Sequence, residues 1–358
     1  MIKSLYDIIR DMDAQDYNYY DCNMVTINAD NISQENAKNF IYNYFSAGEK
    51  TGAVMDIGTI WNNAHERPIH TLLLFFLLIN CYHNCQIKEI LDKELEIFKC
   101  TNKDRISLRF LFLLCLYHDY GYYFERRTDT EDRNIDIHFN ELATLRQMNN
   151  EYFEAPYSKE NIKIYFNKLR NKHEHGISGG TLLSLRLKKN FRKHAEQIKN
   201  GNIDSHNIVW NKKADYDFYD YIGSIIIKHN IWFATDEKAK EKYSKLGLTD
   251  LIINENESNK LSYENNPILF IFCLLDTLEP TKLFIRDWNN GAEITRLLRS
   301  IKIEFGATNR LKLSLPSKEL DIMKTDEYVC KLKGLRTWMQ LNISETRTTD
   351  TIELTLLF

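Results

Sequence analysis

Two side chains that can bind a metal ion, His118 and Asp119, directly follow an apolar stretch of this 358-residue chain. Residues 105–117 are apolar nearly all round, which predicts a fully buried helix. An imidazole and a carboxylate at the end of such a helix cost free energy unless they are paired or bound to a cation. A divalent ion satisfies both groups. Taken alone, the pair fits a helix end that meets solvent equally well.

Further imidazoles lie at the ends of other apolar segments. The pattern is strongly helical from residue 68 to about residue 98, and His70 falls in its first turn, where a proline at residue 68 is tolerated. His65, five residues earlier, is the alternative to His70. His229 ends the apolar run 222–228. These positions suit ligands that point from helix ends into a shared interior site.

Asp276 and the segment around residue 174 extend the set. Asp276 lies inside the apolar helix predicted over 267–277, where a carboxylate needs a partner. The segment His173-Glu174-His175-Gly176 precedes a pair of glycines at 179 and 180. We expect a helix to restart at residue 179, so that both histidines precede it and can face one site.

The ordered series His, His-Asp, His, His, Asp resembles the HD superfamily of helical metal-dependent phosphohydrolases over roughly residues 60–290. The resemblance implies hydrolysis of a phosphate bond in a nucleotide by metal-activated water. It implies one divalent ion, either Mn, Mg, Fe, Co or Ni, held by four residues: His70, His118, Asp119 and Asp276.

Two strings look like segments of the deoxynucleoside triphosphate triphosphohydrolase branch, Arg67-x-x-His70-Thr-Leu and His173-Glu174-x-Gly176. The resemblance implies that Arg67 contacts phosphate and that His173 is an acid–base group tuned by Glu174. The expected products are a deoxynucleoside and tripolyphosphate. Members of that branch carry further histidines soon after the His-Asp pair, whereas the next one here is His138. Cations expected to bind substrate are Arg67, Arg126, Lys172 and Lys282, with Arg127 and Arg286 as further candidates.

A second alignment leads to a different branch. His175-x-x-x-Gly-Gly resembles the third ligand segment of two-metal HD phosphodiesterases, which act on cyclic or linear nucleotide messengers. His175 and His229 would then help to hold a second ion. The sequence leaves the two alignments open. A third interpretation is a catalytically degenerate HD module that senses a nucleotide, although the presence of all four ligands argues against it.

Other motifs carry less chemistry. Cys81-x-His83-x-Cys85 has the residue types of a zinc site, but both cysteines share one face of an apolar helix, so we interpret them as core thiols. The sequence contains no Walker loop, no dinucleotide-binding glycine motif and no serine-nucleophile elbow.

The predicted fold is mainly α, a helical HD-domain bundle with a small α+β C-terminal unit. We expect an N-terminal helical extension over 1–60, the HD domain over 61–290 and the α+β unit over 291–358. Strands of that unit are predicted at 301–305, 310–315 and 352–357, with a helix at 326–340.

Composition narrows the class of protein. A net charge of −3 makes long nucleic acid an unlikely partner. Seven scattered cysteines indicate a reducing compartment. The N-terminus has no apolar signal core, and the longest apolar run is far shorter than the roughly 20 residues of a membrane span. We therefore expect a soluble cytoplasmic protein without a membrane partner. The family resemblance adds a nucleotide substrate, an activating nucleotide and a homo-oligomer.

Overall fold

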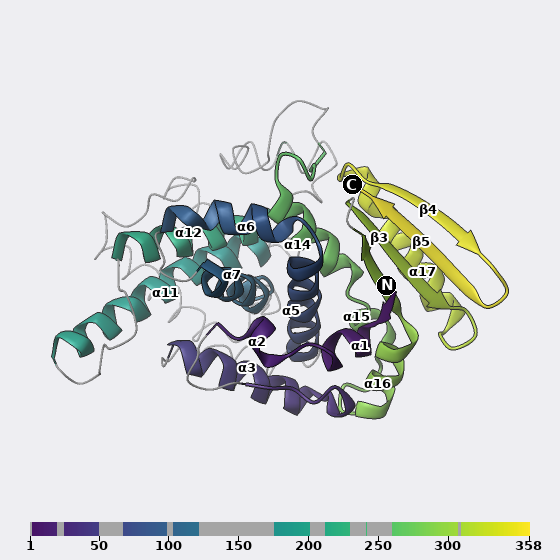
Figure 1. Cartoon of the computed structure of the whole chain (residues 1–358), viewed down its shortest axis with the longest axis horizontal. Helices are drawn as coiled ribbons and strands as arrows, with labels where there is room; N and C mark the ends of the chain where they lie inside the picture. Colours follow the sequence, from purple (N-terminus) through teal and green to yellow (C-terminus); the bar gives the residue numbers. More distant parts are fainter. Residues whose placement is uncertain are drawn as a thin grey trace.

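The computed structural model describes residues 2–19, 25–49, 67–98, 103–121, 175–200, 212–229, 241, 260–306 and 309–358. A mainly helical body is followed by a small antiparallel sheet toward the C-terminus (Figure 1), which confirms the predicted fold class. Some predicted site residues lie outside the described residues; these are Arg126, Arg127, Lys172, His173 and Glu174. The sequence pattern of residues 161–170 also predicts a helix, and residues 238–259 are polar; these segments, apart from residue 241, lie outside the described residues as well.

Three apolar helices form the interior of the body: α5 (Arg67–Asn84), α7 (Lys103–Tyr117) and α14 (Pro267–Leu278). Most of their described side chains are buried because nearly every position is apolar. Both α5 and α14 carry a proline in the first turn, where the missing N–H has no intrahelical partner to lose. Further helices surround these three: α1 (Leu5–Arg10), α2 (Ala14–Tyr17), α3 (Gln34–Glu49), α6 (Ile87–Leu95), α15 (Thr281–Phe284), α16 (Gly291–Ser300) and α17 (Ile322–Gly334). Turns of 3-10 helix lie at Ala29–Asn31, Glu96–Phe98 and Leu335–Thr337.

Helices α11 (His175–Lys199) and α12 (Lys212–Lys228) pack closely against each other. A Cβ atom on Gly180 would lie 2.2 Å from the carbonyl oxygen of Gly223, and a Cβ on Gly223 would lie 2.7 Å from that of Gly180. The glycines therefore permit contact between the two backbones. This corrects the expected start of α11 at residue 179, because the helix begins at His175 and the glycine pair lies inside it.

The sheet has the strand order β1-β2-β3-β5-β4, and every neighbouring pair is antiparallel. Its strands are β1 (Lys3–Ser4), β2 (Lys302–Gly306), β3 (Arg310–Pro316), β4 (Asn342–Arg347) and β5 (Thr351–Leu357). Alternate residues of β3, Leu311, Leu313 and Leu315, are buried in the same apolar core as the helices. The first strand comes from the start of the chain, and both chain ends lie beside the sheet in Figure 1.

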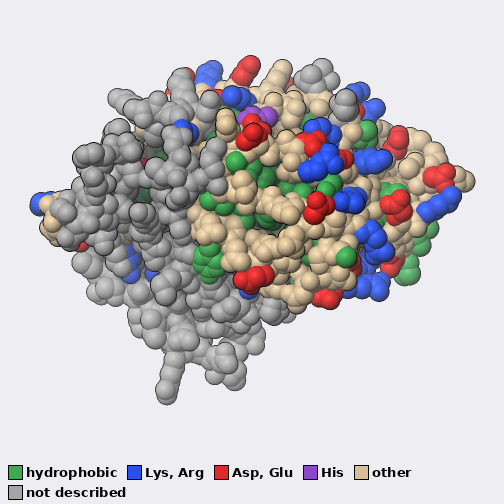
Figure 2. All heavy atoms as spheres, turned by 60° about the horizontal axis from the view of Figure 1, so that its bottom comes forward, with side chains coloured by type: hydrophobic (Ala, Val, Ile, Leu, Met, Phe, Trp, Pro, Cys, Tyr) green, Lys and Arg blue, Asp and Glu red, His purple; other side chains and the backbone are tan. Residues whose placement is uncertain are grey.

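Within the described residues, no single helix is both long and apolar enough to cross a membrane. The segments Pro68–Asn84 and Ile87–Phe98 reach that length and hydropathy only when taken together, and the chain bends by 97° between them. On the described part of the face shown in Figure 2, Lys and Arg side chains lie among Asp and Glu side chains.

Candidate metal centre

Six side chains that were predicted as metal ligands converge in the helical body. They come from α5, the end of α7, the first residue of α11, the residue after α12, and α14, and they form two groups that share one aspartate. The six residues are His70, His118, Asp119, His175, His229 and Asp276. Residues that lie up to 206 positions apart in the sequence, His70 and Asp276, are thus in contact.

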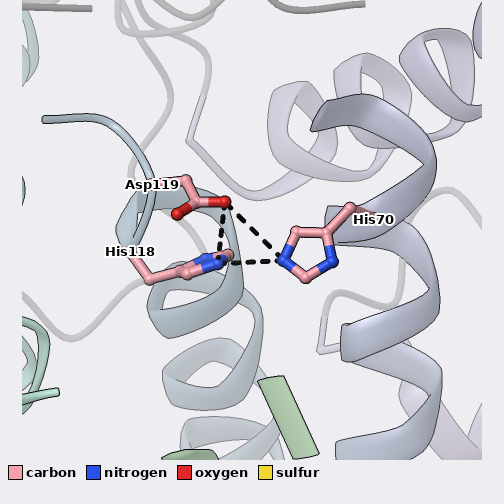
Figure 3. A group of neighbouring side chains, drawn as sticks. All are labelled: His70, His118 and Asp119. Atoms are coloured by element: carbon pink, nitrogen blue, oxygen red, sulfur yellow. Dashed lines mark hydrogen bonds and ion pairs between the residues drawn. The ribbon is translucent and has the colours of Figure 1, made fainter. Parts of the chain in front are cut away.

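The first group has the spacing of a metal coordination shell. The Nε2 atoms of His70 and His118 lie 3.1 Å apart, and Oδ2 of Asp119 lies 3.6 and 3.1 Å from them (Figure 3). Oδ1 of Asp276 lies 3.1 Å from Nε2 of His70 and 3.6 Å from Nε2 of His118. Metal–ligand bonds of about 2.1 Å separate neighbouring ligands by about 3.0 Å in an octahedron and about 3.4 Å in a tetrahedron. The four side chains therefore fit around one divalent ion.

Hydrogen bonds at the Nδ1 atoms of His70 and His118 orient each ring so that its Nε2 atom faces the site. Nδ1 of His118 lies 2.6 Å from the carbonyl oxygen of Cys115, and Nδ1 of His70 lies 2.7 Å from Oε2 of Glu279. Both oxygens are acceptors, so each Nδ1 carries the proton and donates it. When the ring is neutral, each Nε2 has its lone pair directed at the other ligand candidates, which is the usual arrangement of a metal-binding histidine.

Glu279 is a site residue that the sequence interpretation missed. Its side chain is completely buried, with Oε2 accepting from His70 and Oε1 accepting from the backbone N–H of Thr281 at 2.9 Å. The rule that singled out Asp276, that a carboxylate beside an apolar helix needs a partner, also applies to Glu279. It was overlooked because a glutamate before a proline is typical of an exposed helix end.

The second group lies on the other side of Asp119. Its Oδ1 atom is 3.4 Å from Nε2 of His175, and the ligand atoms of Asp119, His175 and His229 all lie within 4.8 Å of one another. Nδ1 of His229 donates to the carbonyl oxygen of Ile226. The buried Nε2 of His229 has no hydrogen-bond partner among the described residues. Asp119 therefore presents one oxygen to each group.

Glycines allow the ligand-bearing segments to approach each other. A Cβ atom on Gly121 would lie 1.9 Å from the carbonyl oxygen of His175. A Cβ on Gly176 would lie 2.6 Å from the carbonyl oxygen of Ile226 and 3.0 Å from Nδ1 of His229. No other residue fits at these two positions without displacing backbone, so the glycines bring His175 against Asp119 and His229.

The charges of the centre favour a cation. Burial alone would lower the pKa of His118, but the neighbouring Asp119 and Asp276 carboxylates outweigh it and raise this pKa to about 9. Burial would raise the pKa of Asp276, but Lys282, His118 and His70 hold it well below its ordinary value. His229 has the opposite behaviour, because burial and the nearby His175 and His118 lower its pKa to about 3.

Lys282 is the predicted substrate-binding cation that the structure brings to the centre. Its Nζ lies 3.4 Å from Oδ2 of Asp119 and 3.4 Å from Oδ1 of Asp276. The side chains of Lys282 and Asp276 are 25% and 21% exposed, whereas those of His70 and His118 are completely buried. Solvent therefore reaches the centre along Asp276 and Lys282.

The remaining predictions are placed as follows. Arg67 begins α5, but its side chain is outside what the structure describes, as is all of His65. Cys81 is buried, Cys85 is half-buried, and Nε2 of His83 bonds to the carbonyl oxygen of Asp16 at 2.8 Å. In the part of the chain that the structure describes, neither cysteine belongs to a group of side chains that could hold an ion.

The donor set narrows the choice of metal. Imidazole nitrogens combined with carboxylate oxygens suit Mn, Fe, Co or Ni. Mg²⁺ prefers an all-oxygen octahedron and suits this set less well.

Comparison of the chain with family models, with curated proteins and with solved structures finds no match. The resemblance to the HD superfamily therefore stays a prediction that depends on the residues themselves.

Proposed function

We propose that the chain is a metal-dependent phosphohydrolase that acts on a nucleotide. The observation that carries this proposal is the buried cluster of two imidazoles and two carboxylates, His70, His118, Asp119 and Asp276, in which the ligand atoms have the spacing of a coordination shell. Such a donor set, reached by solvent from one side, suits a hydrolytic metal centre.

A divalent ion held by these four residues would lower the pKa of bound water and so would supply hydroxide near neutral pH. His118 gives up its proton when its Nε2 becomes a ligand, because metal and proton compete for the same lone pair. Lys282, at the exposed side of the centre, is placed to bind a substrate phosphate and to stabilise the negative charge that grows on its oxygens.

A deoxynucleoside triphosphate is the first substrate we propose, with a deoxynucleoside and tripolyphosphate as products. Support comes from the sequence resemblance around Arg67 and around His173 and Glu174. In this reaction Arg67 would contact phosphate and His173 would protonate the leaving oxygen or align the nucleophile.

The second candidate is a two-metal phosphodiesterase for cyclic or linear nucleotide messengers. A specific observation favours it: Asp119 turns Oδ1 toward His175, and the buried Nε2 of His229 lacks a hydrogen-bond partner among the described residues. An ion held by Asp119, His175 and His229 would share Asp119 with the first ion, and paired ions of this kind stabilise both the attacking and the leaving oxygen.

The test combines metal counting with product analysis. Purified protein is incubated with dNTPs, NTPs and cyclic dinucleotides in the presence of Mn²⁺, Co²⁺ or Mg²⁺, and products are identified by mass, while bound metal is counted by elemental analysis. Tripolyphosphate with one ion per chain supports the first candidate. Monophosphate products with two ions per chain support the second candidate and remove the first. Nucleotide binding without turnover under every condition would overturn the enzymatic proposal in favour of a sensing module.

A further inference from the structure

The last turn of α14 and the short segment that follows it carry three charged groups of the candidate metal centre. Asp276 is a ligand candidate, Glu279 bonds to Nδ1 of His70, and Lys282 contacts the carboxylates of Asp119 and Asp276. The position of this short segment therefore controls both a ligand and the group that orients another ligand.

One face of α17, in the C-terminal unit, holds this segment at separate points. The buried hydroxyl of Tyr328 donates to the carbonyl oxygen of Leu278. Nζ of Lys324 donates to the carbonyl oxygen of Phe284 at 3.2 Å, and the rings of Phe284 and Tyr328 pack edge to face with centroids 5.5 Å apart. Positions 324 and 328 are one helical turn apart, so both side chains lie on the same face of α17.

The contact with Leu278 lies directly beside Glu279. The carbonyl groups in the last turn of a helix have no intrahelical partner, and Tyr328 supplies one for Leu278. The peptide bond makes the carbonyl of Leu278 coplanar with the nitrogen and Cα of Glu279. Fixing that carbonyl therefore fixes where the nitrogen and Cα of Glu279 lie, which restricts the positions from which its side chain reaches His70.

We propose that Tyr328 is a positioning residue of the metal centre, and that α17 thereby couples the C-terminal unit to metal binding. The hydroxyl of Tyr328 holds the Leu278–Glu279 peptide, Glu279 holds Nδ1 of His70, and His70 directs Nε2 at the ion. The proposal depends on the proposed function, because it assumes that the centre binds a divalent ion.

The test uses Tyr328→Phe, which removes the hydroxyl and keeps the packing of the ring. A matched control is Tyr44→Phe, because the hydroxyl of Tyr44 is also buried and also donates to a backbone carbonyl, that of Tyr17 in α2, which carries none of the ligands. Mn²⁺ affinity is measured by calorimetric titration, and the visible absorption bands of Co²⁺-loaded protein report the geometry of coordination.

We expect Tyr328→Phe to weaken Mn²⁺ binding about fivefold, the effect of one ordinary hydrogen bond. Glu279→Gln, which changes the direct contact with His70, is expected to weaken binding by about 10-fold or more. Tyr44→Phe should lose comparable folding stability while keeping the wild-type affinity and the wild-type Co²⁺ bands.

Affinity and Co²⁺ bands that are the same in Tyr328→Phe and Tyr44→Phe would overturn this inference alone. Wild-type protein that binds no divalent ion would overturn the proposed function as well, so the two failures are distinguishable. If Tyr328→Phe does not fold, Lys324→Gln is used instead. This change removes the contact of Lys324 with the Phe284 carbonyl, which comes from the same face of α17, and Lys324 is partly exposed. Unchanged metal affinity in that variant would then count against the proposal.

Discussion

Two buried polar clusters in the helical body differ in how their charges are satisfied. Between α11 and α12, Nζ of Lys188 lies 2.6 Å from each carboxylate oxygen of Asp220, and the hydroxyl of Ser184 donates to one of them. In the candidate metal centre, the Nε2 atoms of His70 and His118 face each other and the carboxylates of Asp119 and Asp276, and Lys282 contacts both carboxylates from the exposed side. The first cluster pairs donors with acceptors, whereas the second gathers groups that can each give an electron pair to an ion.

The difference shows which buried polar groups indicate a binding site. A buried ion pair with matched hydrogen bonds is explained by the fold that contains it. A cluster of electron-pair donors is stable only with a positive charge among them, either protons or a metal ion. Without a metal ion, the Asp119 and Asp276 carboxylates favour a proton on His118 and so raise its pKa to about 9.

Substituting the proposed ligands of the metal centre should have the largest effect and is the first test of the difference between the two clusters. His118→Ala and Asp119→Ala should each reduce nucleotide turnover on the order of 1000-fold or more, because each change removes a ligand of the ion that activates water. Turnover is measured with the best substrate of the panel, and circular dichroism verifies the fold. Activity that survives both changes in folded protein would contradict the proposed function.

Removing a charge from the other cluster should affect stability instead. Asp220→Asn removes the carboxylate charge that lies 2.6 Å from the buried ammonium of Lys188, so we expect a loss of about 3 kcal/mol in the free energy of unfolding. Urea denaturation measures this loss, and Mn²⁺ titration serves as the control. A large drop in metal affinity without a drop in stability would show that the two clusters are not separate in function.

The pH dependence of metal binding is a third test of the difference between the two clusters, with a smaller expected effect. His118 is protonated below its pKa of about 9 in the metal-free centre, so the ion must displace a proton over that range. Apparent Mn²⁺ affinity should therefore rise by about tenfold per pH unit between pH 6.5 and 9 and level off above. Titrations at several pH values measure the slope, and an affinity independent of pH would mean that no ligand releases a proton.

The same shift has a consequence for the metal-free protein. Because the folded-state pKa of His118 is raised from 6.5 to about 9, its stabilising contribution is fully present below pH 6.5 and is lost as the pH rises through 9. Metal-free protein should thus unfold more easily at pH 9 than at pH 6.5, while metal-loaded protein should not lose this contribution.

The side chains that meet in the candidate metal centre stand out in the sequence because they interrupt apolar segments. His118, Asp119 and Asp276 are polar residues beside or inside helices that have no polar face, so their types and positions indicate an interior site. Glu279 follows the same apolar helix, but its place directly before a proline is typical of an exposed helix end, so its type and position did not single it out.

The fold could be predicted where local patterns decide it. The alternating leucines of β3 and the apolar run of α14 lead to the observed elements. Strand β4 has the polar sequence Asn-Ile-Ser-Glu-Thr-Arg and forms as the edge partner of β5, so its own residues give no strand pattern. Likewise, Lys3 and Ser4 become a strand only because β2 is available to pair with them.

The ligands of the centre are distributed over helices that lie far apart along the chain, from His70 in α5 to Asp276 in α14. No short fragment of the chain contains the complete set, so an unfolded chain offers no comparable site. Binding of an ion there would therefore be thermodynamically linked to folding of the whole helical body. A bound ion at 100 times its dissociation constant would add about 2.7 kcal/mol to the stability of that body. The supply of divalent metal would thus set how much of the protein persists as well as how fast it works.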